Sequence, residues 1–248
     1  GHAIIAISTL AVNMKWISPR EGDNVLKIDT PCGRISSYVH VKNGIVQHVR
    51  FHCVPSYVVG LDKTIILKDL GTITYDLAYG GAFYAYVDID KNDFTFDLSS
   101  QHYQQLINIG MKIKNGIMNT DHSIKHPYEE DLNFLYGTIF IDNNKQASGS
   151  DSKNVCVFAE GEVDRCPTGS GVSGRMAIHK MRCDLDIGDI MTFESITGSV
   201  FKGSVVSEQL YSSFKSVIPQ VEGTAYITGM QTFVFDPKDS IKIGFMLR

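Results

Sequence analysis

The segment 164–171, Asp-Arg-Cys-Pro-Thr-Gly-Ser-Gly, has the residue types and spacing best suited to chemistry. It follows an apolar run and precedes a helical pattern over 172–181. Gly169 and Gly171 allow a ligand to approach the backbone closely, and the unpaired N–H groups of a first helical turn attract an anion. Asp164 places a carboxylate beside that helix end. The segment therefore predicts a site for a small zwitterion, with its carboxylate on the N–H groups and its ammonium on Asp164.

This segment resembles the second active-site loop of the proline racemase family, Asp-Arg-Ser-Pro-Cys-Gly-Thr-Gly, and the resemblance extends over nearly the whole chain. Thr168 is the important departure, because racemases and epimerases of the family carry a catalytic cysteine at that position. Threonine there resembles the trans-3-hydroxy-L-proline dehydratases of the family. Other family-like segments are 1–3, 76–83, 126–127, 134–138 and 198–201.

The resemblance implies the roles of the site residues. In the family a cysteine base directly precedes the Gly-His pair that stands here at Gly1 and His2, so we expect this chain to begin one residue after its base. About a quarter of a typical family member is then expected to be absent from it. The implied substrate-binding residues are Gly1, His2, Phe158, Asp164, Gly169 and Ser170, with Thr168 at the position of the second racemase cysteine.

The chemistry of residue 168 separates the possible reactions. Racemisation needs an acid or base on each face of the substrate ring, and a threonine hydroxyl is too weak for that role near neutral pH. In trans-3-hydroxy-L-proline the hydroxyl and the Cα hydrogen share one face, so a single cysteine suffices for the elimination of water to Δ1-pyrroline-2-carboxylate. A cofactor-independent dehydratase is expected. A hydroxyproline epimerase or proline racemase and a non-catalytic ligand-binding relative remain alternatives, and the acid for the leaving hydroxyl stays open between the cysteine thiol and His2.

Other patterns compete with this interpretation and are weaker. The residues 169–174 also satisfy G-x-G-x-x-G, but five residues separate a plausible strand from the first glycine, and strands rather than βαβ units follow. Cys166 matches the family's serine and precedes Pro167, which argues against a catalytic role. His40, His48 and His52 lack the carboxylate or cysteine that would complete a ligand set. We therefore predict no dinucleotide, no cofactor and no metal.

Composition limits the class of protein. The chain has 248 residues, of which 43% are hydrophobic and 20% charged, as in an ordinary globular protein. A net charge of −4 argues against nucleic acid, and no apolar run approaches the ~18 residues of a membrane span. Five cysteines without a C-x-x-C pair predict reduced thiols and a cytoplasmic location. The expected partner is a small imino acid, and the family resemblance favours a homo-oligomer.

The periodicity predicts many strands and few helices, hence an α+β fold. A helix is expected over 101–116, besides those that begin at Gly1 and Gly169. Asn43 and Gly44 are typical of a tight hairpin turn. Strands are expected over 25–30, 49–54, 72–78, 138–141 and 225–235.

Two parts of the chain share the same order of sequence features. In each part a glycine lies at the start of a helix, a strand follows, and a second glycine comes before a proline. From Gly1 to Gly33 is 32 residues and from Gly169 to Gly198 is 29. This predicts a two-lobed fold like that of the proline racemases and diaminopimelate epimerases, with pseudo-symmetric lobes that each contain a central helix. Lobe one is expected to comprise 1–56 plus 236–248, and lobe two 57–235. Because lobe one would be incomplete, we predict that residues 1–248 alone are poorly stable.

Overall fold

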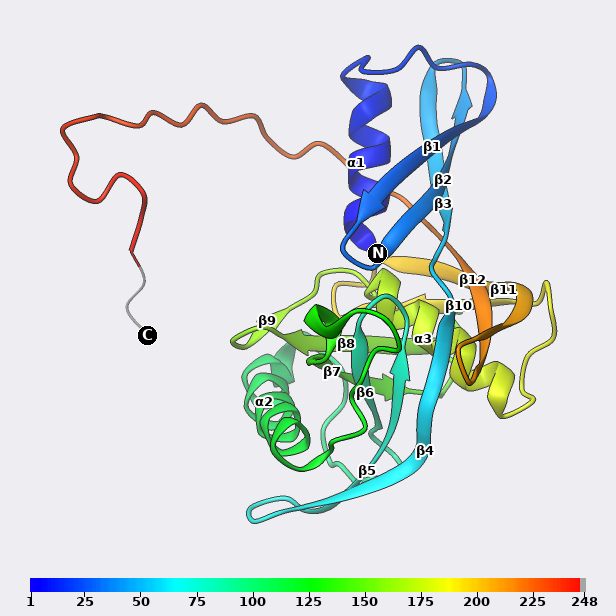
Figure 1. Ribbon diagram of the computed structural model, residues 1–248, viewed down its shortest axis with the longest axis vertical. Helices are drawn as coiled ribbons and strands as arrows, with labels where there is room; N and C mark the ends of the chain where they lie inside the picture. Colours follow the sequence, from blue (N-terminus) through cyan, green and yellow to red (C-terminus); the bar gives the residue numbers. More distant parts are fainter. Residues whose placement is uncertain (246–248) are drawn as a thin grey trace.

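The computed structural model describes residues 1–245. In Figure 1 a small upper part holds α1 and β1 to β3, a larger lower part holds the other elements, and the chain ends in a long extended segment. No helix in the described residues is long and apolar enough to cross a membrane. The main elements are α1 (His2–Asn13), β1 (Gly22–Thr30), β2 (Gly33–Lys42), β3 (Ile45–His52), β4 (Ser56–Leu67), β5 (Gly71–Tyr79), β6 (Phe83–Asp88), α2 (Tyr103–Thr120), β7 (Leu135–Asp142), β8 (Ser152–Phe158), β9 (Glu162–Val163), α3 (Gly169–Met181), β10 (Ile190–Glu194), β11 (Val200–Tyr211) and β12 (Phe214–Gly223).

The upper part is a helix on a three-stranded antiparallel meander. Less and more exposed residues alternate along β1, β2 and β3, with fully buried positions in β2 and β3, as expected for strands with one face on a core. The turn between β2 and β3 has positive φ at Asn43 and Gly44, which confirms the predicted hairpin. Helix α1 buries Ile4, Ile5 and Val12 and packs against β2 and β3.

The lower part is a ring of strands around α3. The sheet follows the order β1-β2-β3-β12-β11-β10-β8-β7-β6-β5-β4, and an additional β12–β4 pairing closes the eight strands from β12 to β4 within the described chain. Strand β6 is buried on both faces, which explains its unbroken run of apolar and aromatic residues. Helix α3 packs against β4, β5, β11 and β12, and nine of its 13 residues are buried.

Helix α2 covers the outside of this ring over β7 and β8. It spans Tyr103–Thr120 rather than the predicted 101–116 and buries Leu106, Gly110, Ile113 and Ile117. A Cβ atom on Gly110 would lie 2.8 Å from Cβ of Val157, so this glycine sets how closely the helix approaches β8. The fold is thus the predicted α+β mixture.

The repeated plan is visible in the element order. Helix α1 precedes the antiparallel strands β1, β2 and β3, and α3 precedes the antiparallel strands β10, β11 and β12. Strands β3 and β12, the last of each set, pair with each other and join the two parts. The domain boundaries, 1–56 plus 236–248 and 57–235, stay a prediction, and residues 246–248 lie outside the described range.

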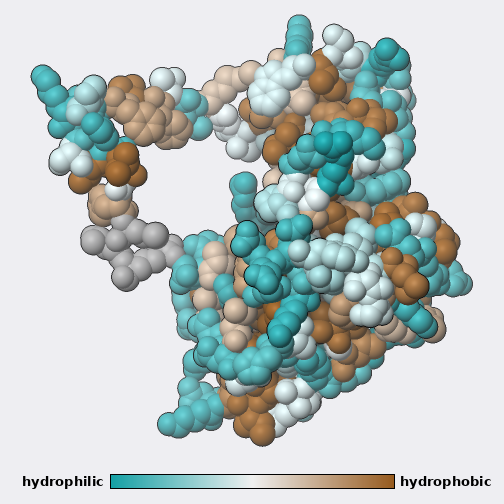
Figure 2. Space-filling view, viewed as in Figure 1, coloured by the Kyte–Doolittle hydropathy of each residue, from teal (hydrophilic) through white to brown (hydrophobic). Residues whose placement is uncertain are grey.

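The predicted strand over 225–235 is wrong. The last strand, β12, ends at Gly223, and residues 224–245 form neither helix nor strand. Apolar and β-branched residues favour a strand only where a neighbouring strand supplies hydrogen bonds, and none of the described residues pairs with this segment. Figure 2 shows hydrophobic residues exposed along it.

Candidate functional site

The N-terminal ends of α1 and α3 touch each other. A Cβ atom built on Gly1 would lie 2.3 Å from the backbone nitrogen of Ser170, and one on Gly169 would lie 2.8 Å from the carbonyl carbon of Gly1. No side chain fits at either position, so both glycines are required for the approach. Because the first N–H groups of a helix lack intrahelical partners, two sets of donors converge where the helices meet.

A cavity of about 420 Å³ lies at this junction. The predicted residues Gly1, His2, Asp164, Thr168 and Ser170 all line it, whereas Gly169 lies behind the lining in contact with Gly1. Phe158 is not part of the lining. The full lining consists of 1–4, 30–32, Ile35, Cys53, 80–82, Tyr84, Leu132, Phe134, Tyr136, Asp164, Thr168 and Ser170.

Phe158 supports the wall of the cavity from behind. Its ring stacks on that of Tyr136, with centroids 5.5 Å apart and an interplanar angle of 13°. Tyr136 and Phe134 therefore form the aromatic wall of the cavity, and Phe158, expected to bind substrate, instead holds Tyr136 in position.

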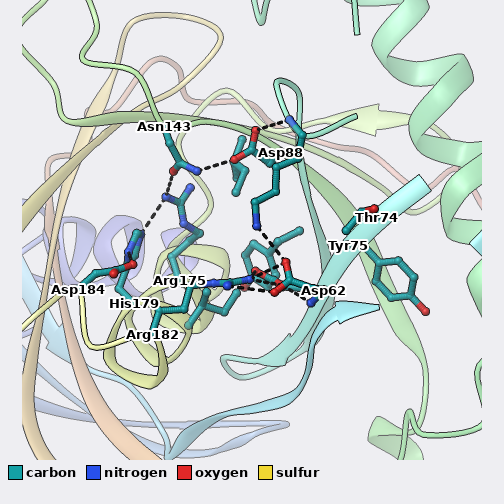
Figure 3. A pocket seen from close by; sticks show the side chains of 14 residues that line it. Asp62, Thr74, Tyr75, Asp88, Asn143, Arg175, His179, Arg182 and Asp184 are labelled. Atoms are coloured by element: carbon teal, nitrogen blue, oxygen red, sulfur yellow. Dashed lines mark hydrogen bonds and ion pairs between the residues drawn. The ribbon is translucent and has the colours of Figure 1, made fainter. Parts of the chain in front are cut away.

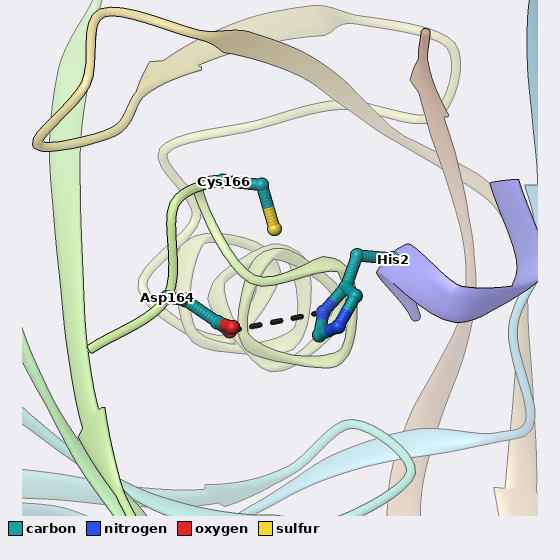
Figure 4. Close-up of side chains that lie close together, drawn as sticks. All are labelled: His2, Asp164 and Cys166. Atoms are coloured by element: carbon teal, nitrogen blue, oxygen red, sulfur yellow. Dashed lines mark ion pairs between the residues drawn. The ribbon is translucent and has the colours of Figure 1, made fainter. Parts of the chain in front are cut away.

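Asp164 and Thr168 form a buried polar pair. The two residues are 9% and 2% exposed, and the Thr168 Oγ1 hydroxyl donates to Asp164 Oδ2 over 2.7 Å. Thr168 has φ +68°, a region that β-branched residues rarely adopt, so the surrounding loop constrains it. The imidazole of His2 faces the same carboxylate, with Nδ1 3.8 Å from Oδ2 (Figure 4).

Ser170 and Tyr84 form a second polar pair at the start of α3. Their hydroxyl oxygens lie 2.8 Å apart. Burial raises the pKa of Tyr84 well above its ordinary value, so the phenol stays neutral. Next to it, the Tyr86 hydroxyl donates to the Gly171 carbonyl over 2.9 Å. Strand β6 thus fixes the first turn of α3 through two tyrosine hydroxyls.

Three thiols near the cavity are held in the protonated form. Burial and the nearby charge of Asp164 raise the pKa of Cys166 to about 11. The same two causes raise the pKa of Cys156 well above its usual range. Burial also raises the pKa of Cys53, whose thiol donates to the Gly80 carbonyl over 3.4 Å. A thiol needs its thiolate to act as a base, so these environments argue against catalysis by any of the three.

Sequence reasoning missed several lining residues. Tyr84 follows the family-like segment 76–83, and Phe134 and Tyr136 lie in another, so a closer reading of those segments could have found them. Cys32 and Cys53 carry no such signal. They reach the cavity only because the ends of β1 and β3 meet there.

A second cavity, of about 230 Å³, lies between α3 and β5 to β7 (Figure 3). Its central guanidinium, that of Arg175, is buried, and burial lowers its pKa to about 10. Arg175 donates to Asn143, Ser152 and Asn154. Because its donors already have protein acceptors, this cavity is a structural network and a weaker candidate than the helix junction.

Comparison with known protein families gives a match over almost the whole chain. The family model for proline racemase matches residues 1–246. The chain belongs to the proline racemase family. The cavity between the two helix N-termini, with the Asp164 carboxylate in its lining, therefore belongs to a member of this family.

Individual relatives of the proline racemase family differ in activity. A trans-3-hydroxy-L-proline dehydratase of Colwellia psychrerythraea is 41% identical over 249 residues, covering 100% of this chain and 69% of that protein. A 3-hydroxyproline 2-epimerase of Burkholderia multivorans is 40% identical over 248 residues, covering 100% and 73%. A crystal structure of a probable proline racemase from Agrobacterium radiobacter has a TM-score of 0.92 at 28% identity, covering 100% and 71%. The predicted proline racemase-like fold is confirmed. Sequence identity to these relatives does not distinguish a dehydratase from an epimerase.

Proposed function

We propose that this protein is a trans-3-hydroxy-L-proline dehydratase, a lyase that eliminates water without a cofactor to give Δ1-pyrroline-2-carboxylate. One observation carries the proposal: the residue at the position of the second racemase cysteine is Thr168, whose hydroxyl proton is already donated to Asp164. A carboxylate is an acceptor only, so this proton is not available to the substrate. The relative from Colwellia psychrerythraea supports the same activity.

Substrate binding follows from the charges around the cavity. The substrate carboxylate binds the N–H groups at Gly1, His2 and Ser170, where two helix dipoles add to the attraction, and Gly169 behind them lets the two helix ends meet. The ring ammonium binds Asp164. As the Cα proton leaves, negative charge develops on the substrate carboxylate, and fixed donors stabilise that charge without reorganisation.

Proton transfer takes place on one face of the ring. By the family resemblance, the base is a cysteine directly before Gly1, at the α1 end of the cavity. The Cα proton passes to that thiolate, a C–C double bond forms between Cα and C3, and the hydroxyl leaves as water with a proton from the newly formed thiol or from His2. The enamine product then tautomerises to the imine. Thr168 lies at the other helix end and contributes no proton to the opposite face.

Epimerisation is the second candidate, because the relative from Burkholderia multivorans is a 3-hydroxyproline 2-epimerase of nearly the same identity. It requires a base on the second face. Of the groups that line the cavity, Cys32 is a thiol that could serve, and its Sγ lies 3.2 Å from Thr30 Oγ1. A Cys32→Ser variant therefore belongs in the test below.

The deciding experiment follows products by NMR in deuterated water. The protein, with the family's cysteine before Gly1, is incubated separately with trans-3-hydroxy-L-proline, 4-hydroxyproline and proline. Pyrroline-2-carboxylate from the first substrate alone supports the dehydratase. Inverted product that carries deuterium at Cα, lost in Cys32→Ser, would instead establish an epimerase. No turnover and no solvent exchange with any substrate would favour the non-catalytic relative.

We further propose a cytoplasmic location. All five cysteines are free in the described structure, and free thiols persist best in a reducing compartment.

A further inference from the structure

Three side chains with different donor atoms converge at the edge of the cavity. His2 begins α1, whereas Asp164 and Cys166 belong to the loop between β9 and α3 (Figure 4). One ligand atom from each residue lies within 4.8 Å of the other two. The family resemblance places His2 and Asp164 in one site, but nothing in the sequence indicates that the Cys166 thiol joins them.

The donor set is selective. Imidazole nitrogen, carboxylate oxygen and cysteine sulfur together suit zinc, whereas magnesium and calcium prefer oxygen alone. Tetrahedral zinc with bonds of roughly 2.0 to 2.3 Å holds its ligand atoms about 3.4 Å apart. His2 Nδ1 and Asp164 Oδ2, 3.8 Å apart, are close to that spacing. Because all three ligand atoms lie within 4.8 Å of one another, the sulfur has to approach by no more than about 1 Å to reach this spacing.

Each ligand is able to bind an ion. The His2 side chain is 51% exposed, so its ring has room to turn. Thr168 occupies one position on Asp164 Oδ2, and a carboxylate offers about four lone-pair sites in all. Cys166 stands where the quoted family loop has serine, so the sulfur ligand is a feature of this chain rather than of that loop.

We propose that His2, Asp164 and Cys166 form a zinc site, and that bound Zn²⁺ excludes the substrate from the cavity. The Cys166 thiol releases its proton to solvent as the sulfur binds the ion. Three protein ligands leave a fourth position for water. Occupancy removes Asp164 as the ammonium partner, because Zn²⁺ with one thiolate and one carboxylate leaves no net negative charge at the site. This inhibitory consequence rests on the proposed substrate orientation, whereas the binding of zinc does not.

Direct binding is tested with ZnCl₂ and CoCl₂ on the protein. Zinc is titrated against a chromophoric chelator, and cobalt is followed by its thiolate charge-transfer absorption. One equivalent and a thiolate band are expected. Cys166→Ser should lose the band and lower zinc affinity at least about tenfold. Cys183→Ser, which removes an exposed thiol elsewhere, is the matched control and should change neither. Unchanged affinity and band in Cys166→Ser would overturn the site.

Two further measurements extend the test. The first uses the unmodified protein and so does not depend on the folding of a variant, and the second distinguishes failure of the zinc site from failure of the proposed reaction. Zinc should slow alkylation of Cys166 in the unmodified protein, measured by peptide mass spectrometry, and leave Cys183 unaffected. With trans-3-hydroxy-L-proline, zinc should raise KM without lowering kcat, and Cys166→Ser should remain active but lose this inhibition. Equal zinc inhibition in both proteins would overturn the exclusion of substrate. A chain that binds zinc but turns over no hydroxyproline would contradict the proposed function and leave the zinc site standing.

Discussion

Asp164 is the residue on which most of the site's polar contacts depend. Its carboxylate accepts the Thr168 hydroxyl, faces His2 and is only 9% exposed. A buried carboxylate is costly unless it is paired, and here its neighbours are a neutral hydroxyl donor, the His2 imidazole and the neutral Cys166 thiol. The site is therefore prepared for a further positive charge, which a substrate ammonium or a metal ion supplies.

Replacing Asp164 should therefore abolish turnover. In Asp164→Ala the ammonium loses its partner and Thr168 loses its acceptor, so we expect kcat/KM to fall on the order of a hundredfold or more. Asp69→Ala, which removes an exposed carboxylate paired with Lys112, is the control and should keep full activity. Substrate-dependent formation of pyrroline-2-carboxylate measures both. Turnover within a fewfold of the unmodified protein in Asp164→Ala would exclude the role of ammonium partner.

Residue 168 should determine whether a second proton transfer occurs. Thr168→Cys places a thiol at the start of α3, on the face opposite the expected base, so exchange of Cα hydrogen of proline or 4-hydroxyproline with solvent should appear. Thr168→Ser keeps a hydroxyl able to donate to Asp164 and should retain elimination without exchange. NMR in deuterated water distinguishes the two. Exchange that is equal in both variants, or absent from both, would mean that residue 168 does not control the reaction.

At the scale of elements, α2 is held to the ring by a charged cluster at its end as well as by its apolar face. Asp121, the residue after α2, accepts from Tyr75 Oη over 2.8 Å and pairs with Lys63 Nζ over 2.8 Å. Burial alone would raise its pKa, yet hydrogen bonds from Lys63 and Ser123 outweigh burial and lower it to about 2. The cluster therefore links the end of α2 to β4 and β5 only while Asp121 is ionised.

Asp121→Asn should destabilise the fold in a pH-dependent manner. Because the folded-state pKa is about 2 and the unfolded value is 3.8, ionised Asp121 stabilises the fold above pH 4, and this contribution is lost as pH falls towards 2. With solvent screening we expect the variant to lose about 1 kcal/mol of unfolding free energy at pH 7 and progressively less below pH 4. Urea denaturation across this range measures it. Asp69→Asn, in an exposed pair, should differ by less than about 0.5 kcal/mol, and a pH-independent deficit in Asp121→Asn would refute the role of its charge.

The sequence predicted some helices, strands and turns better than others. The start of α3 was predictable because Gly169 and the following apolar period are local signals, and Asn43 with Gly44 specified their turn locally. Strand formation at 225–235 was not predictable, since it depends on a partner strand. Likewise, the meeting of Cys32 with Tyr84 and Thr168 depends on the β3–β12 pairing that joins the two parts, which no local pattern records.

At the scale of the whole molecule, the site exists because two parts of the chain meet. The ends of α1 and α3 touch at Gly1 and Gly169, and β3 pairs with β12 beside them. Each part supplies one helix end and one wall of the cavity. A change in the angle between the parts would separate the two sets of N–H donors, so binding of one carboxylate by both helices should also hold the parts together.

The extended segment 224–245 should govern how the chain behaves in solution. Phe233, Val234 and Phe235 are 82%, 86% and 71% exposed, and such contiguous apolar surface favours association. We expect the chain of residues 1–248 to self-associate as its concentration rises. The double variant Phe233→Ser/Phe235→Ser should shift sedimentation velocity profiles towards monomer, because it removes two aromatic rings from solvent contact. The matched variant Gln231→Ser/Thr232→Ser changes neighbouring polar residues and should associate as before.

A monodisperse monomer with a sharp cooperative melt in the unmodified chain would contradict both the association and the poor stability predicted from the sequence.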